Sequence, residues 1–138
     1  MKFGHTIIYV SDVKASLAFF EKAFGLKTRF VYEPDYGELD TGATTLAFAH
    51  HSLGASHFPA GYGAADASAL PLGIEIALVT DAVVESHRRA IAAEAVSLSE
   101  PGMQPWGQTV SYVRCPDGTL VELCAPVAAA GEFAAVGD

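Results

Sequence analysis

The chain is poor in several residue types that would point to particular classes of protein. Its 138 residues include two cysteines, two methionines, one tryptophan, and eight basic residues against sixteen acidic ones. The formal net charge of −8 disfavours a nucleic-acid partner, because a phosphate backbone binds basic surfaces. Cys115 and Cys124 match neither a zinc spacing nor a CxxC redox pair, so we expect two free thiols in a reducing compartment.

Long apolar runs are also missing. No run approaches the roughly 20 residues that cross a bilayer, so no membrane partner is expected. The chain enters a strand pattern at Phe3 without the charged segment and cleavage site of a secretory signal. A hydrophobic content of 51% nevertheless excludes a disordered chain. We therefore expect a cytoplasmic protein with a single domain over residues 1–138.

Two halves of the chain carry the same order of predicted elements. The first half has a strand pattern over 3–10, an apolar helical stripe over 13–24 that stops at Gly25, and three short strands. The second half repeats this order from residue 74 to residue 124, so the sequence predicts β-α-β-β-β twice. We expect modules at about 1–50 and 73–127, a linker over 51–72, and a frayed tail over 128–138.

Sliding one half over the other by seventy positions aligns residues of possible chemical interest. This shift pairs His5 with Glu75 and Tyr36 with Trp106, and a longer hairpin in the second half then pairs Leu46 with Glu122. The register of the second half stays open by one residue, because another alignment places Ile74 opposite His5. A slip of one residue turns a side chain to the other face of its strand.

Glu122 follows a tight turn at Pro116-Asp117-Gly118 and lies between apolar neighbours on a predicted strand. A carboxylate in such surroundings needs a proton, a cation or a metal ion. If the two sheets curve toward each other, His5, Glu75 and Glu122 converge in one cavity. One imidazole and two carboxylates suit a borderline divalent ion such as Zn²⁺, Ni²⁺, Mn²⁺ or Fe²⁺.

Three stretches resemble the vicinal oxygen chelate superfamily, which includes glyoxalase I, bleomycin-resistance proteins and extradiol dioxygenases. They are residues 5–13 with 19–26, reading HTIIYVSDV and FFEKAFGL, and residues 117–123, reading DGTLVEL. The resemblance covers about residues 3 to 127. It implies an α+β fold in which two βαβββ modules form curved mixed sheets around a cleft, often completed by a homodimer.

The resemblance also implies where a site would lie. Metal enzymes of this superfamily take ligands from the first and last strand of each module, which here are His5, Leu46, Glu75 and Glu122. Leu46 cannot bind a metal, so the implied ligands are His5, Glu75 and Glu122, with Glu122 also the candidate catalytic group. The residues expected to line a ligand site are Ile7, Tyr9, Tyr36, Leu46, Phe48, Trp106 and Cys124.

Two functions remain open at this point. The first is a divalent-metal-dependent enzyme, a glyoxalase-like lyase or isomerase or a dioxygenase, acting on a small substrate that chelates the metal through oxygen. The second is a metal-free protein of the bleomycin-resistance type, which binds a flat or cationic small molecule. The cofactor is accordingly one divalent ion (Zn, Ni, Mn or Fe) or none, and the expected partners are a small molecule and a second copy of the chain.

Overall fold

A computed structural model describes residues 1–127 and confirms the two βαβββ modules. The expected tail at 128–138 lies outside the described residues. The elements of the first module are β1 (His5–Val10), α1 (Val13–Phe24), β2 (Lys27–Tyr32), β3 (Tyr36–Asp40) and β4 (Thr45–His50). Those of the second module are β5 (Glu75–Val79), α3 (Val83–Ala92), β6 (Val96–Met103), β7 (Thr109–Arg114) and β8 (Leu120–Cys124).

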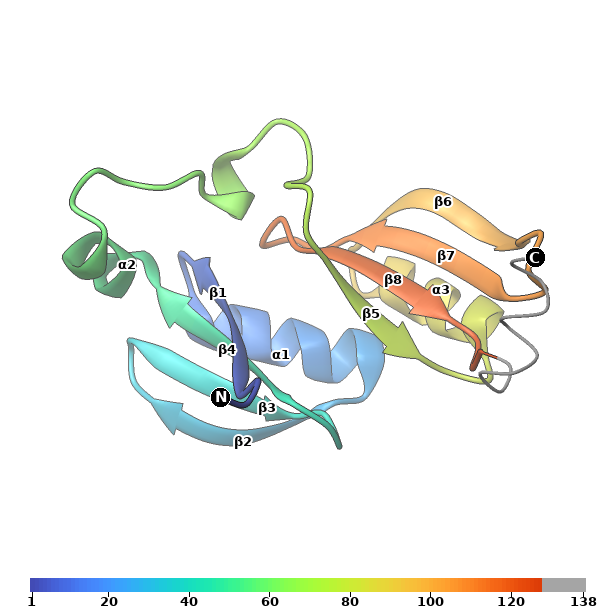
Figure 1. Ribbon diagram of the computed structural model, residues 1–138, viewed down its shortest axis with the longest axis horizontal. Helices are drawn as coiled ribbons and strands as arrows, with labels where there is room; N and C mark the ends of the chain where they lie inside the picture. Colours follow the sequence, from blue (N-terminus) through green and yellow to red (C-terminus); the bar gives the residue numbers. More distant parts are fainter. Residues whose placement is uncertain (128–138) are drawn as a thin grey trace.

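Each module forms its own four-stranded mixed sheet, with strand orders β1-β4-β3-β2 and β5-β8-β7-β6 (Figure 1). The first strand of each module runs parallel to the last one, and the other neighbours are antiparallel. Within the described part of the chain, no strand pairing joins β1 to β5, so the two sheets remain separate. The molecule is therefore a repeat of one unit rather than one continuous sheet.

Helix α1 begins and ends where the sequence predicts. Asp12 caps α1 by accepting a hydrogen bond from the Ala15 N–H at 3.0 Å, and α1 ends at Gly25 with φ 71°. The end of α3 lacks a glycine, and Glu94 adopts the left-handed conformation there with φ 81°. Arg89 on α3 donates to the carbonyl of Lys22 at 2.7 Å, and this hydrogen bond connects α3 to the C-terminal end of α1.

The core lies between the sheets and the helices, and α1 and α3 also contact each other. Phe48 is fully buried in this core, with its ring centroid 5.0 Å from that of Phe20 on α1. It therefore faces the helix, which corrects the expectation that Phe48 lines a ligand site. The largest fully buried side chains are Phe20, Phe48, Leu39, Leu123, Val10, Val113 and Val121. Burial of these side chains is the main stabilising contribution to the fold.

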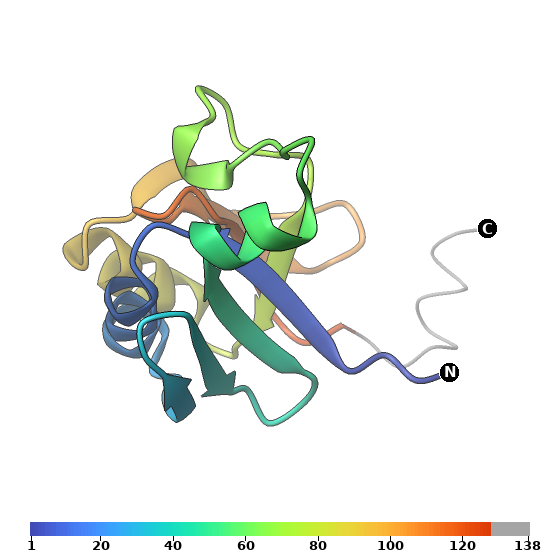
Figure 2. The same ribbon diagram turned by 90° about the vertical axis from the view of Figure 1, so that its left-hand side faces the viewer.

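Residues 51–72, which we call the strap, are more ordered than a plain linker. They contain a short helix, α2 (His51–His57), and one 3-10 turn, η1 (Ala65–Ala67), and they cross one end of the molecule (Figure 2). The Ser11 hydroxyl donates to the Asp66 carboxylate at 2.5 Å, which fixes the strap to the first module. Arg114 donates to the carbonyls of Ala65 and Ser68 at 3.0 and 2.7 Å, which fixes it to the second.

Two further expectations concern the whole chain. Cys115 and Cys124 are free, as predicted. Both are also buried, and burial raises the pKa of both thiols. Among residues 1–127, no helix is both long and apolar enough to span a membrane.

Candidate functional site

The faces of the two sheets that point away from the helices carry several of the predicted site residues. His5, Ile7 and Tyr9 alternate along β1 with residues that face the core, and Glu75 occupies the place of His5 on β5. His5 pairs with Thr45 on β4, and Glu75 pairs with Leu120 on β8. The shift of seventy residues between the first strands is thus confirmed, and the alternative with Ile74 opposite His5 is wrong. We call these two surfaces the open faces.

The pairing of the last strands differs from the prediction by one residue. Ile7 lies opposite Ala47, and Ala77 lies opposite Glu122, so Ala47 rather than Leu46 is the counterpart of Glu122. Gly42 lies three residues before Thr45, where β4 begins, whereas Gly118 lies two residues before Leu120, where β8 begins, and this extra residue explains the difference. Leu46 is consequently buried among core residues on the helix side of its sheet.

The open face of the first module holds a hydrogen-bonded cluster around Glu38 on β3. The Tyr36 hydroxyl donates to Glu38 Oε2 at 2.8 Å, and Arg29 Nη2 donates to Glu38 Oε1 at 3.2 Å and to Thr45 Oγ1 at 2.5 Å. His5 Nε2 lies 3.7 Å from Glu38 Oε2. The hydrogen bond from Tyr36, followed by the Arg29 guanidinium, lowers the pKa of Glu38, so this carboxylate is charged and neutralised locally.

The open face of the second module carries two carboxylates beside each other. The Tyr112 hydroxyl donates to Glu122 Oε1 at 2.6 Å, which raises the pKa of Tyr112 to about 12. Burial and the neighbouring Glu122 charge raise the pKa of Glu75. Burial and the same charge raise the pKa of Cys124 to about 11. No cation contacts this pair within the described structure, so the second face is acidic where the first is balanced.

The residues of one chain do not fit a metal ion. His5 contacts Glu38 in the first module, whereas Glu75 and Glu122 lie together in the second. Over residues 1–127, no three His, Cys, Asp or Glu side chains come close enough to hold a metal. Arg29 also forms a salt bridge with Glu38, and its positive charge would repel a metal cation at that carboxylate. Convergence of His5, Glu75 and Glu122 in one cavity of a single chain is therefore not observed.

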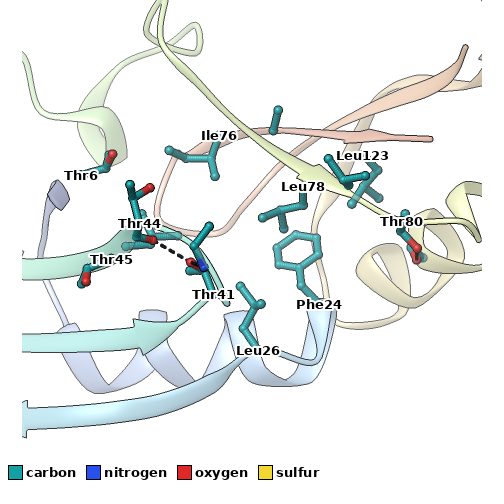
Figure 3. Close-up of a pocket in the computed structure, with 15 residues that line it drawn as sticks. Thr6, Phe24, Leu26, Thr41, Thr44, Thr45, Ile76, Leu78, Thr80 and Leu123 are labelled. Atoms are coloured by element: carbon teal, nitrogen blue, oxygen red, sulfur yellow. Dashed lines mark hydrogen bonds between the residues drawn. The ribbon is translucent and has the colours of Figure 1, made fainter. Parts of the chain in front are cut away.

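A cavity of about 450 Å³ lies between the two modules (Figure 3). Its apolar walls come from α1, β4, β5 and β8, and hydroxyl groups from several elements line it as well. No charged side chain is among the described residues that line it. The apolar residues include Phe24, Leu26, Leu46, Ile76, Leu78 and Leu123, and the hydroxyl-bearing residues are Thr6, Thr41, Thr44, Thr45, Thr80 and Ser86. We call this cavity the inter-module pocket.

The remaining predicted ligand residues lie in different surroundings. Ile7 and Tyr9 line a smaller cavity beneath the strap. Trp106 is 43% exposed and lies in the turn before β7, where its indole donates to the Gln108 side chain at 2.8 Å. It is not the structural counterpart of Tyr36, which begins a strand. Of the predicted ligand residues, Leu46 lines the inter-module pocket.

Sequence reasoning missed two groups of site residues. Glu38 was not singled out, although the pattern Tyr36-Gly37-Glu38-Leu39 alternates polar and buried residues and places Tyr36 and Glu38 on one face. The threonines of the inter-module pocket were also missed. They come from separate turns and strands, so no spacing in the sequence indicates that they meet.

Solved structures confirm the fold, at identities that carry no information on activity. A glyoxalase-related enzyme from Fulvimarina pelagi is 20% identical with a TM-score of 0.75, covering 91% of this chain and 88% of that one. A lactoylglutathione lyase from Agrobacterium tumefaciens is 21% identical with a TM-score of 0.68, covering 90% and 92%. TioX from Micromonospora sp. ML1 is 18% identical with a TM-score of 0.67, covering 91% and 98%.

A comparison with curated proteins finds no match. The family model for the Glyoxalase/Bleomycin resistance protein/Dioxygenase superfamily matches residues 2–123, which is most of the chain. This agrees with the two repeated modules and with the resemblance of the three sequence stretches. The chain therefore belongs to the Glyoxalase/Bleomycin resistance protein/Dioxygenase superfamily.

Proposed function

We propose that this chain is a small-molecule-binding member of its superfamily, and that it takes an uncharged, largely apolar organic molecule into the inter-module pocket without a metal. The observation that carries the proposal is the lining of that pocket, which combines apolar walls with hydroxyl groups and holds no charge. Its volume of about 450 Å³ lies within the range of ligand sites, roughly 300–1,000 Å³.

The lining also selects the chemical class of the ligand. A charged group would lose its hydration in this pocket without gaining a counter-ion, which is strongly unfavourable. Threonine hydroxyls both donate and accept hydrogen bonds, so carbonyl, ether and hydroxyl oxygens of a neutral ligand can all find partners. The apolar walls favour rings or branched chains in the rest of the molecule. A neutral, oxygen-bearing ring compound satisfies all three conditions.

The proposal is tested by titrating the protein with Nile red, an uncharged dye with fused rings and a carbonyl, and following its fluorescence. We expect saturable binding of one dye per chain. Ser86→Phe places a large side chain at the pocket wall on α3 and should weaken binding at least tenfold. Ala92→Phe adds the same side chain at an exposed position of the same helix and should leave binding unchanged. Equal affinity of both variants and the wild type would refute the proposal.

Side chains that could bind a metal ion lie in pairs on the open faces, and this favours a second candidate function. His5 lies beside Glu38 on one face, and Glu75 lies beside Glu122 on the other. A second copy that brought the first face of one chain against the second face of its partner would gather a histidine and several carboxylates. Such a homodimer would be a candidate divalent-metal-dependent enzyme, a lyase, isomerase or dioxygenase, acting on a small oxygen-chelating substrate.

Exposed apolar side chains on the open faces support a homodimer. Ile7 is 45% exposed on β1, Tyr32 is 66% exposed on β2, and Val79 is 67% exposed on β5. Light scattering would give the mass in solution, and elemental analysis of protein purified without a histidine tag would give its metal content. A dimer with about one metal per chain, lost in Glu122→Gln, would support the enzyme. Metal-free protein that gains no thermal stability from added Zn²⁺, Ni²⁺, Mn²⁺ or Fe²⁺ would reject it.

A further inference from the structure

We propose that the inter-module pocket binds a short neutral peptide, which adds to the free edge of β5 as an extra strand. This inference rests on the proposed function, because it names the chemical class of the ligand for the same pocket. β5 lies at the edge of its sheet and pairs there with β8. Its other edge therefore carries backbone N–H and C=O groups that no described strand pairs, and an extended peptide has the complementary groups.

The pocket meets β5 from its edge rather than from one of its faces. Residues 76–79, four in a row on this strand, all line the pocket. Side chains of consecutive strand residues point to opposite faces, so a cavity on one face alone would contact every second residue. Ile76 and Leu78 turn their side chains into the cavity (Figure 3), so Ala77 and Val79 contact it from the strand edge. Since β8 covers the other edge, the cavity lies along the free one.

One hydrogen bond at the end of β5 determines which backbone groups face the pocket. The Thr80 N–H donates to the Cys124 carbonyl of β8 at 2.9 Å. The N–H and C=O of a strand residue point to the same edge, and those of the next residue point to the other edge. Leu78 therefore faces β8, as Thr80 does, because the register between the two strands is unbroken. Ala77 and Val79 direct their N–H and C=O groups to the pocket, so the edge offers two donors and two acceptors.

The free edge of β5 is regular, whereas the outer edges of both sheets are interrupted. The register with the neighbouring strand shifts once along β2 and twice along β6, and β6 also contains Pro101. Such interruptions hinder pairing with a further strand. β5 has no register shift, no proline and no lysine. The edge that can accept a strand is therefore the one beside the pocket.

Hydroxyl groups from the first module can meet the second row of carbonyls on a bound peptide. The hydroxyls of Thr41 and Thr45 already bond inside the protein, to the Thr44 carbonyl at 2.6 Å and to Arg29 at 2.5 Å. Within residues 1–127, the hydroxyls of Thr6 and Thr44 make no hydrogen bond, and neither residue is buried. Both line the pocket (Figure 3), so each can donate to a peptide carbonyl that points away from β5.

The lining also sets the length and the charge of the peptide. The four residues of β5 that border the pocket span about 13 Å at roughly 3.3 Å per residue, which matches a peptide of three or four residues. The described lining holds no charged side chain, so the ends of the peptide must be blocked. Alternate side chains of an added strand would share the face of Ile76 and Leu78 and meet Phe24 and Leu26, which favours apolar residues there.

A blocked tripeptide and its ester analogues test strand addition. The probe is acetyl-Val-Phe-Val-N-methylamide, and each analogue has an ester oxygen in place of one backbone N–H. An ester keeps the extended shape and removes a single donor. Donors that face β5 alternate along the peptide with donors that face away. In calorimetric titrations, every second analogue should therefore bind at least tenfold more weakly than the amide, and the analogues between them should bind within threefold of it.

Amide hydrogen exchange followed by NMR locates the added strand on the protein. In the free protein, the N–H of Leu78 should exchange slowly, because it faces β8, and those of Ala77 and Val79 should exchange quickly. Saturating peptide should slow exchange at Ala77 and Val79 at least tenfold and leave the outer edge strand β2 unchanged. Ala77→Pro removes a donor that points away from β8, so the pairing of β5 with β8 stays intact. This variant should bind the peptide at least tenfold more weakly.

The outcomes separate this inference from the proposed function. Wild-type protein that binds Nile red but not the peptide would overturn strand addition alone, whereas protein that binds neither would overturn the proposed function as well. The ester series uses wild-type protein and so decides the question even if Ala77→Pro does not fold. Alternating losses in that series, with slowed exchange at Ala77 and Val79, would support strand addition. Equal affinities of all the analogues, or unchanged exchange at both residues, would overturn it.

Discussion

The two modules share one backbone plan but carry different chemistry on their open faces. Each face has a tyrosine that donates to a glutamate, Tyr36 to Glu38 in the first module and Tyr112 to Glu122 in the second. In the first module Arg29 neutralises the glutamate, whereas in the second Glu75 adds a second negative charge. The same fold unit thus makes one balanced face and one acidic face.

The two open faces differ because the glutamate lies on a different strand in each module. Glu38 lies opposite Ala47, and Tyr112 lies opposite Glu122, so the carboxylate has moved across by one strand between the modules. The tyrosine that serves it comes from the same strand in the first module and from the neighbouring strand in the second. A repeat of the backbone therefore does not imply a repeat of the site.

The modules also differ in how they meet the strap. Gly118 and Gly42 occupy the turns before the last strands, both with positive φ, 90° and 75°. An added Cβ at Gly118 would lie 2.1 Å from the Ala65 carbonyl oxygen, whereas one at Gly42 would meet nothing within 4 Å. The strap therefore packs tightly against the second module's turn. The equivalent turn of the first module is free of such a contact.

The largest expected effect concerns the core that both modules share. Phe48→Ala should lower the free energy of unfolding by about 3–5 kcal/mol, because the ring is fully buried against α1. Urea unfolding measures the change, and Phe48→Leu, which keeps most of the volume, should lose much less. A loss below about 1 kcal/mol for Phe48→Ala would mean that Phe48 is not in the core and would restore it as a ligand residue.

A matched pair of glycine substitutions sharpens the comparison of the two turns. Gly42→Ala should lower stability by about 1–2 kcal/mol through its positive φ alone. Gly118→Ala adds a backbone clash with the strap and should lower it by roughly 2 kcal/mol more. Unfolding in urea compares the two variants directly. Equal losses would show that the strap does not press on the second turn.

The ends of the two helices give a stabilising prediction. Gly25 ends α1 with φ 71°, and Glu94 holds the corresponding conformation after α3 with φ 81°. Glu94→Gly should raise the free energy of unfolding by about 1 kcal/mol, because glycine adopts this conformation without steric cost. Gly25→Ala should lower stability by a similar amount. Thermal unfolding of both variants tests the pair, and a destabilised Glu94→Gly would contradict the assigned backbone.

The smallest expected effects are changes in stability when the glutamates of the open faces are replaced, and they have opposite signs on the two faces. Above pH 4.5, the ordinary pKa of a glutamate, the raised pKa of Glu75 makes the folded state less stable as the pH rises, until its folded-state pKa is passed. Glu75→Gln should therefore raise the melting temperature at neutral pH by about 1–2 °C. The lowered pKa of Glu38 stabilises the folded state above pH 4.5, and this contribution is lost as the pH falls through its folded-state pKa.

Glu38→Gln should accordingly lower the melting temperature at neutral pH by about 1–2 °C. The difference in melting temperature between Glu75→Gln and the wild type should disappear below about pH 4, where the carboxyl is protonated in both the folded and the unfolded state. The difference for Glu38→Gln should disappear at a still lower pH for the same reason. Melting curves from pH 3 to pH 8 test both substitutions. Shifts of the same sign in the two variants would contradict the contrast between a balanced and an acidic face.

Much of the fold could be predicted from the sequence, because the spacing of apolar residues and the residues that form turns can both be read over short stretches of the chain. The apolar stripe of α1, its glycine stop and the strand patterns gave the element order and the two modules. The short helix α2 was missed, because His51–His57 offers no apolar stripe and little helix propensity. The tight attachment of the strap was missed because it depends on contacts such as Arg114 with the Ala65 carbonyl, far apart in the chain.

Only the site residues whose place follows from their position along a strand could be predicted from the sequence. His5 and Glu75 begin equivalent strands, and this was found from the repeat. Strand β4 is apolar on both faces, so alternation alone could not tell that Phe48 faces the helix and Ala47 the open side. One extra residue between the turn glycine and the last strand of the first module then changed which residue matches Glu122. The inter-module pocket depends on how α1 and α3 pack, which no local pattern reports.

The most direct test of metal-free binding in the inter-module pocket is equilibrium dialysis of Nile red in the presence and absence of a chelator. The protein would be purified without a histidine tag and dialysed against EDTA or against added Zn²⁺, Ni²⁺, Mn²⁺ and Fe²⁺ in turn. We predict one dye per chain with the same affinity under every condition, and loss of binding in Ser86→Phe. Binding that requires a metal, or that Ser86→Phe leaves intact, would contradict the account.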